Sequence, residues 1–150
     1  MKTYITAVLL LLSCTILAQD MTPEKMRLIL AQEAIVMEEE GSIVQYDYGD
    51  IPIMLIYDVD ANRMRLISPV IEAAKLTESD LELLMEANFD RALDAKYAIS
   101  NGLLWSAYAH PLRELQEEQL KGALRQVRNL VLSYGDTYTS TEYVFGGGDN

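Results

Sequence analysis

The residues that could bind a metal ion are few and poorly spaced. Asp58, Asp60 and Asn62 provide the acids and the amide that open a calcium-binding loop. Such a loop also needs a glycine and a bidentate glutamate further along, where this sequence has Arg63 and Pro69. We therefore interpret the segment as a polar hairpin turn and expect no metal site.

Nucleophilic and imidazole chemistry is equally poorly supported. The sequence has one histidine, His110, and one cysteine, Cys14. A lone imidazole lacks the partner of a shared metal site, and Cys14 lies in an N-terminal leader. Gly146–Gly148 is not followed by a helix, so it forms no phosphate-binding loop. The sequence thus predicts no catalytic residue, no metal ligand, no cofactor and no enzymatic activity. The alternative is a small-ligand-binding protein or an enzyme of unknown class.

The charge balance excludes two further classes of partner. There are 12 basic and 23 acidic residues, a net charge of −11. Nucleic acids and anionic membrane surfaces both require clustered basic side chains, so we expect neither. Glu38–Glu40, with Asp47 and Asp50, forms an acidic cluster that we interpret as a solvated helix end. Docking of a basic partner is the alternative.

Aromatic side chains on predicted strands are the remaining candidates for binding. Alternation places Tyr46 and Tyr48 on one face of their strand, and it places Leu104, Ser106 and Tyr108 on one face of another. Packing within the protein accounts for these rings. The functional alternative is an apolar face for a partner peptide, with these candidate residues: Tyr46, Tyr48, Trp105 and Tyr108.

The first 18 residues have the pattern of a secretory signal peptide. Lys2 is followed by the apolar run Ile5–Leu12, and Ala18 offers a small residue for cleavage. We expect a periplasmic or secreted protein after cleavage near Ala18. Leu11–Cys14 resembles a lipobox, so a lipoprotein anchored at Cys14 is the alternative. Later in the chain no stretch approaches the ~18 apolar residues of a membrane span.

The mature chain alternates between helical and strand-like patterns. Thr22-Pro23-Glu24 opens a helix whose apolar periodicity runs to Met37 and ends at the acidic run before Gly41. Three strands are predicted at residues 42–48, 51–57 and 63–68. The middle one is a nearly continuous apolar run, which is typical of a central strand.

The second half has two helices and one hairpin. Thr77 caps a helix that runs to about residue 93. Asn101-Gly102 predicts a tight turn between strands at residues 97–100 and 103–110. A last helix covers residues 114–134 and stops at Gly135. Residues 136–150 are expected to form a flexible tail, in which residues 141–145 have the composition of a short strand.

This order, α-β-β-β-α-β-β-α, predicts an α+β fold in residues 19–135. The strands connect by hairpins, so the sheet should be largely antiparallel, with five strands and with helices packed on it. The sequence shows no internal repeat and no linker that would divide this single domain.

Three segments carry a family resemblance. Leu76–Phe89 has a capped start and an Ala-Asn-Phe end, Arg65–Val70 is the strand that leads into it, and Leu103–Trp105 follows the hairpin turn. Together they resemble the type III secretion chaperone-like fold of the Tir-chaperone and YbjN-like proteins, over residues 26–134. The resemblance implies a small acidic homodimer that binds protein clients through its sheet and apolar patches. With the leader, it predicts an exported protein-binding module of chaperone or adaptor type.

Overall fold

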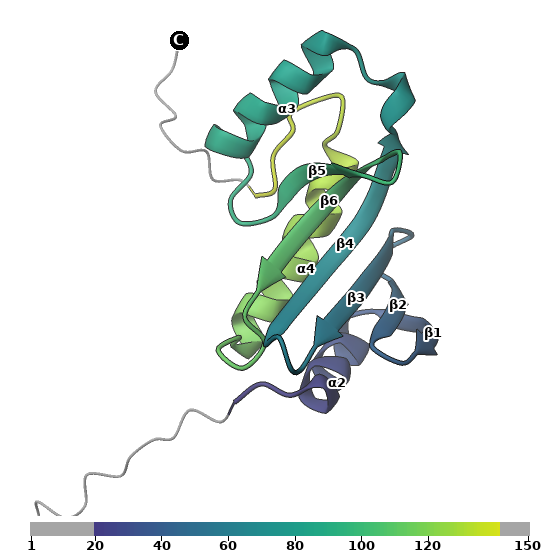
Figure 1. The fold of residues 1–150 in the computed structure, drawn as a ribbon, viewed down its shortest axis with the longest axis vertical. Coiled ribbons are helices and arrows are strands. Elements are labelled where there is room, and N and C mark those ends of the chain that lie inside the picture. The colour runs from purple at the N-terminus through teal and green to yellow at the C-terminus, as the bar shows by residue number, and fades with distance from the viewer. Residues whose placement is uncertain (1–19, 142–150) are drawn as a thin grey trace, which may run out of the picture.

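Residues 20–141 of the computed structural model form an antiparallel sheet with helices against one of its faces (Figure 1). The structure describes these residues only. The predicted signal peptide and residues 142–150 at the end of the predicted tail lie outside the described residues.

The first helix is shorter than its sequence pattern predicts. Helix α2 spans Pro23–Glu33 and is capped by Thr22 Oγ1, which accepts from Lys25 N at 3.3 Å. Residues Ile35–Glu40 then form strand β1, so the sheet has six strands rather than the five predicted. Helical geometry would have placed three carboxylates at the negative end of the helix dipole, and the β-branched Ile35-Val36 pair favours a strand.

Three hairpins build the first two thirds of the sheet. Strand β1 pairs with β2 (Ile43–Asp47), β2 with β3 (Pro52–Asp58), and β3 with β4 (Arg63–Glu72). Gly41, with φ +58°, makes the first of these turns. Strand β4 is longer than predicted because a bulge beside Pro69 lets it continue to Glu72.

A fourth hairpin completes the sheet at its other side. Strands β5 (Lys96–Ser100) and β6 (Leu103–His110) are joined by the Asn101-Gly102 turn, as the sequence predicts. Strand β6 pairs with β4, which gives the antiparallel order β1-β2-β3-β4-β6-β5. The confirmed fold class is therefore α+β with an antiparallel sheet.

Two further helices flank this sheet. Helix α3 (Glu78–Asp90) follows a short 3₁₀ turn, η2 (Ala73–Lys75), and begins with a capping box in which Thr77 and Asp80 bond each other's backbone N–H groups. Helix α4 (Glu117–Leu132) lies behind β4 and β6, whereas α3 lies beyond the end of the sheet beside β5 (Figure 1). Helices α2 and α4 thus cover one face of the sheet, which we call the inner face.

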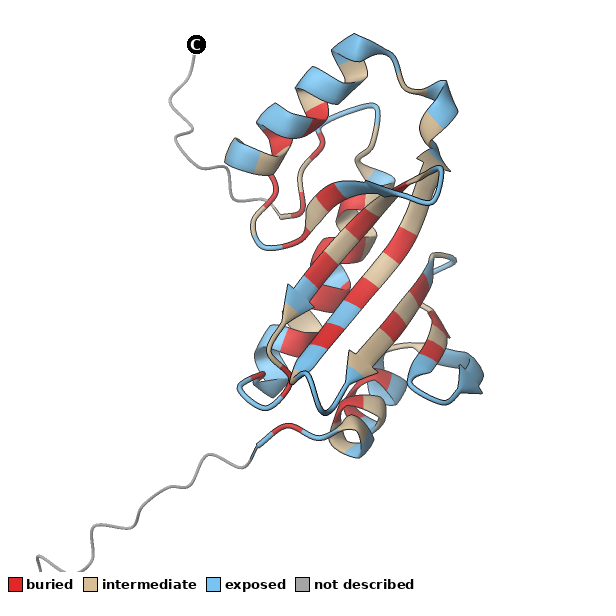
Figure 2. Cartoon of the chain, viewed as in Figure 1, coloured by how far each residue is buried: buried red, intermediate tan, exposed pale blue. Residues whose placement is uncertain are grey.

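The core lies between the inner face and these two helices. Along much of β2, β3, β4 and β6 every second residue is buried, which produces the alternating bands of Figure 2. Helix α4 contributes a buried stripe at helical spacing. The strand residues of the inner face are Val44, Tyr46, Ile53, Leu55, Met64, Leu66, Ser68, Tyr97, Leu104, Ser106 and Tyr108.

The first part of the predicted tail is packed rather than flexible. Tyr138 is buried against the rings of Tyr97 and Tyr134. Ser140 Oγ accepts from Leu93 N at 2.7 Å, and Asn129 Nδ2 donates to Ser140 O at 3.1 Å. The polar composition hid this packing, because the Ser and Thr side chains here bond backbone groups of the fold rather than water.

Candidate interaction surface

The face of the sheet opposite α2 and α4, which we call the outer face, is apolar over its central strands. No helix of residues 20–141 covers it, and Figure 1 shows these strands open to the viewer. Its aliphatic side chains are direct cross-strand neighbours in two adjacent rows. Ile43 pairs with Ile56 in one row, and Met54 pairs with Ile67, which pairs with Ala107, in the other. At the other end Trp105 lies between Pro69 and Ala98.

The outer face is only partly shielded by its own side chains. Met54, Ile56 and Ile67 are half-buried, and Ile43 is 45% exposed. The inner-face residues of the same strands are essentially fully buried. A sheet face that is meant to meet water usually carries polar side chains, so this composition indicates a surface that is covered in use.

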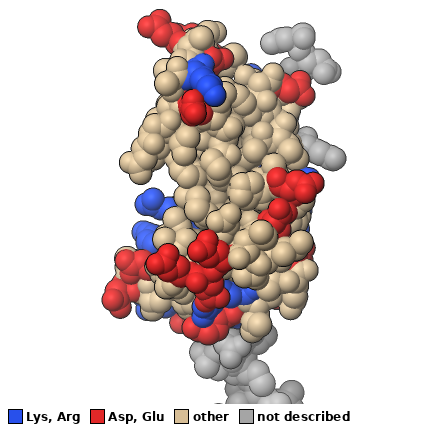
Figure 3. All heavy atoms as spheres, turned by 90° about the vertical axis from the view of Figure 1, so that its right-hand side faces the viewer, with Lys and Arg blue, Asp and Glu red and all other residues tan. Residues whose placement is uncertain are grey.

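Charged side chains frame this apolar area. Glu38 and Glu40 lie beside Gln45 and Ile43 at the β1 edge, and Arg65 lies between Ile56 and Ala109 on the far strands. Figure 3 shows acidic side chains gathered over the lower part of the β1 side, with few charges over its middle. An apolar centre with a charged rim is the usual composition of a protein–protein interface.

Helix α3 presents a second apolar stripe. Leu81, Met85 and Phe89 follow one another at a spacing of four residues and are 40, 68 and 88% exposed. The opposite side of α3 is fixed to the fold by buried Leu84 and Ala87. These three side chains therefore belong to the surface and not to the core of the fold.

The four aromatic candidates do not form one surface. Tyr46 is fully buried on the inner face, and its hydroxyl has no hydrogen-bond partner within the part of the chain that the structure describes. Tyr108 is buried on the same face and stacks on His110, with ring centroids 6.1 Å apart. These two rings therefore belong to the core, as the packing interpretation held.

Tyr48 and Trp105 are half-buried, on opposite faces of the sheet. The guanidinium of Arg128, on α4, lies 5.7 Å from the centroid of the Tyr48 ring, and its Nε donates to Tyr48 O at 3.1 Å. The Trp105 indole lies on the outer face and donates from Nε1 to Ser100 O at 3.0 Å. Of the four candidates, Trp105 alone contributes to the outer face.

Burial raises the pKa of three tyrosines of the inner face, Tyr46, Tyr97 and Tyr108. Desolvation raises the pKa of Tyr46 to about 12, and it raises the pKa of Tyr97 to about 12. The Tyr97 hydroxyl donates to Leu130 O on α4 at 2.6 Å. The rings of Tyr46 and Tyr97 are structural, since neither reaches a cavity where a substrate could bind.

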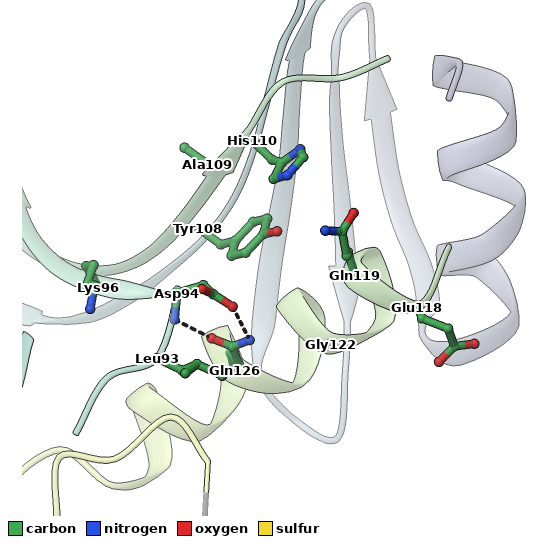
Figure 4. Close-up of a pocket in the computed structure, with 10 residues that line it drawn as sticks. All are labelled: Leu93, Asp94, Lys96, Tyr108, Ala109, His110, Glu118, Gln119, Gly122 and Gln126. Carbon is green, nitrogen blue, oxygen red and sulfur yellow. Dashed lines mark hydrogen bonds between the residues drawn. The ribbon is translucent and has the colours of Figure 1, made fainter. Parts of the chain in front are cut away.

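A hollow of about 620 Å³ lies on the helix side of the sheet, between β6, the segment before β5, and α4. Figure 4 shows its lining side chains, with Gln126 at the base. Gln126 Oε1 accepts from Asp94 N at 2.9 Å and from Ala95 N at 3.1 Å, and its Nε2 donates to Asp94 Oδ2 at 3.2 Å. The amide therefore ties α4 to the chain that enters β5.

Several of the polar groups around this hollow are bonded within the chain. Lys96 Nζ donates to Asn88 O and Ala92 O, both at 2.6 Å. His110 Nδ1 lies 2.8 Å from Pro111 O, a carbonyl that only accepts, so Nδ1 donates. Residues 20–141 contain no cluster of His, Cys, Asp and Glu that could hold a metal ion.

The Asp58–Asn62 segment is a hairpin turn between β3 and β4. Asp58 Oδ1 accepts from Ala61 N at 2.8 Å, which is the local bond expected of a turn aspartate. Asn62 has φ +51° and its side chain bonds Glu114 and Arg113 N, so it anchors the turn to the segment between β6 and α4.

No helix within residues 20–141 has the length and apolar character needed to cross a membrane. The sequence matches no protein-family model and no curated protein. A search of solved structures found a chain of the crystal structure titled "Crystal Structure of the ExsC-ExsE Complex", with a TM-score of 0.53 and 17% sequence identity. The match covers 75% of this chain and 91% of that chain. The fold is thus type III secretion chaperone-like.

The outer face could have been recognised from the sequence, because its aliphatic side chains belong to continuous apolar runs. Strand β3 is apolar at successive positions, and such a run is typical of a strand buried on both faces. The described chain covers only one of those faces. The continuous apolar run was therefore evidence for a covering partner as well as for a central strand.

Proposed function

We propose that this protein is an exported, non-catalytic protein-binding module of chaperone or adaptor type, which binds an extended apolar segment of a partner protein across the outer face. The observation that carries the proposal is the row of aliphatic side chains on β2, β3, β4 and β6 that no element of residues 20–141 covers. The similarity to a chain of a two-protein complex supports the fold on which such binding would depend.

The charge pattern narrows the chemistry of the partner segment. The rim of the outer face carries Glu38 and Glu40 at the β1 edge, and the whole chain has a net charge of −11. A segment with apolar side chains at its centre and basic side chains toward β1 complements both features.

A second copy of this chain is the proposed partner of the α3 stripe. Leu81, Met85 and Phe89 lie on a helix beyond the sheet, apart from the outer face, so one copy could use both surfaces at once. A twofold axis beside α3 would pair the stripe with itself, which is how a self-complementary interface forms. Light scattering should give twice the monomer mass for the chain starting at Gln19, and the monomer mass after Phe89→Asp.

Site-specific photocrosslinking tests the outer face directly. A photoreactive amino acid replaces Ile67 on the outer face or, as the control, Arg125 on the exposed side of α4. In cells that export the protein, the Ile67 probe should yield a discrete crosslinked species, and Met54→Asp in the same chain should abolish it. A crosslinked species that persists with Met54→Asp, or that forms equally from Arg125, would contradict the proposal.

The predicted export has its own test. The intact mass of the protein from the cell envelope should correspond to a chain that starts at Gln19. A chain starting at Cys14 with added acyl mass would establish the lipoprotein alternative, and a chain starting at Met1 would contradict export.

A small-ligand site has less support. The hollow beside β6 is its natural place, but Asp94, Lys96 and His110 are already bonded to groups of this chain. A ligand that recruited them would have to replace those bonds.

A further inference from the structure

Strand β6 has an open edge next to the hollow. Strand β5 pairs with β6 only from Leu103 to Ala107, where Lys96 is the last partner. Strand β6 continues to His110 and there pairs with β4 on its other side. Within residues 20–141, the outward edge of Tyr108–His110 therefore has no strand partner. Such an edge readily accepts an added strand.

The hollow offers room beside that edge for an extended segment. Its volume of about 620 Å³ lies within the usual range of protein binding sites. On the α4 side one lining residue is Gly122, and a Cβ built there would meet no atom within 4 Å. The helix thus leaves space opposite the β6 edge, with nothing of residues 20–141 inside it.

The described chain ends close to this hollow, beside Leu93 at its rim and Asn129 on α4. Ser140 is fixed to Leu93 by the bond from Leu93 N, and Leu93 lines the hollow together with Asp94. Nine more residues follow Thr141 in the sequence. Nine extended residues reach about 30 Å, which is ample for a path from Leu93 to His110.

The residues that follow have the composition of a strand with an apolar end. The sequence continues Glu142-Tyr143-Val144-Phe145 and then has three glycines. Tyr, Val and Phe favour strands, and a run of glycines favours a turn or an end. Alternation would direct Tyr143 and Phe145 to one side and Val144 to the other.

We propose that residues 142–145 dock as an added strand on the open edge of β6 and fill the hollow against α4. The segment begins beside Leu93, near the point where Lys96 pairs with Ala107, and would extend from there toward His110. The added strand would therefore run parallel to β6. This segment of the same chain is the favoured occupant because it begins next to the site, so its effective concentration there exceeds that of a separate molecule.

Disulfide trapping tests the position of the segment. The chain from Gln19 onward contains no cysteine, so two can be introduced without interference. Gly122→Cys with Phe145→Cys should form an intramolecular disulfide readily in the full mature chain. Ile43→Cys with Phe145→Cys is the matched control, because Ile43 is exposed on the far side of the sheet. Equal oxidation rates in the two variants would overturn the proposal, and so would a disulfide-linked dimer from the Gly122 variant, which would assign the site to a second copy.

Hydrogen exchange tests the pairing without a crosslink. Amides alternate in direction along a strand, so at least one amide of Tyr108–His110 points away from β4. Replacing both Tyr143→Ser and Phe145→Ser should speed exchange in this stretch about tenfold, and Gly122→Leu, which fills the hollow, should do the same. Unchanged exchange in both variants would overturn the proposal. The outer face would be unaffected by either result, because the hollow lies on the helix side of the sheet.

Discussion

The two faces of one sheet differ in what covers them. On the inner face Leu66 is fully buried beneath the helix layer, whereas its neighbour Ile67, on the outer face, is half-exposed beside Met54 and Ala107. Both faces are apolar in the central strands. Folding of the chain accounts for the inner face, because burial there stabilises the monomer. The outer face gains nothing comparable in the monomer, so its apolar character indicates a requirement that lies outside the isolated chain.

The largest expected difference between the faces is in stability. Leu66→Ala should lower the free energy of unfolding by about 3 kcal/mol, because it leaves a cavity in a closed core. Ile67→Ala, one residue along the same strand, should cost less than about 1 kcal/mol and should instead weaken the photocrosslink from the outer face. Urea denaturation of both variants measures the difference. Equal losses would show that the outer face is packed within the isolated chain.

Alkaline pH should act on the inner face alone. In the unfolded chain Tyr46 and Tyr97 ionise near pH 10, whereas in the folded protein their pKa is raised to about 12. Stability is therefore complete below pH 10 and is lost as the pH rises through that interval, by about 5 kcal/mol for the pair at pH 12. The chain with Tyr46→Phe and Tyr97→Phe together is the control. If it loses stability over the same interval to the same extent, these two rings are not responsible.

A smaller effect should separate the two tyrosines from each other. Tyr97→Phe removes the bond to Leu130 O, leaves that carbonyl without its side-chain donor, and should cost about 1 kcal/mol. Tyr46→Phe removes a hydroxyl with no partner in residues 20–141 and should be neutral or slightly stabilising. Thermal unfolding of the two variants gives the comparison. A larger loss for Tyr46→Phe would mean that its hydroxyl has a partner that the described chain does not supply.

The sequence predicted the helices, strands and turns better than it predicted which of their faces are buried. Local signals placed the Asn101-Gly102 turn, the Thr77 cap and the course of β6, because each depends on a few adjacent residues. The boundary of α2 was wrong because apolar periodicity continues through Ile35-Val36-Met37, where pairing with β2 outweighs helical propensity. Which face of a strand a helix covers is decided by the tertiary structure and is not visible in the local sequence.

The candidate site was harder to predict for the same reason. Aromatic rings draw attention in a sequence, yet Tyr46 and Tyr108 lie in the core. The outer face is built mainly from Met, Ile and Ala, whose presence in a strand is ordinary. What makes them notable is the absence of a covering layer over that side of residues 20–141, and residue types do not record this.

The pairing of β4 with β6 has a consequence for how the chain reaches its native state. Strands β1 to β4 join through short turns, and so do β5 and β6, so each group can form early from contacts close in sequence. Joining the groups brings Met64 next to His110 and closes a long loop that contains α3. Because that closure costs chain entropy, we expect the encounter of the two hairpin groups to be the slow step of folding. Until it occurs, the facing edges of β4 and β6 are unpaired, and the chain is most open to aggregation during this interval.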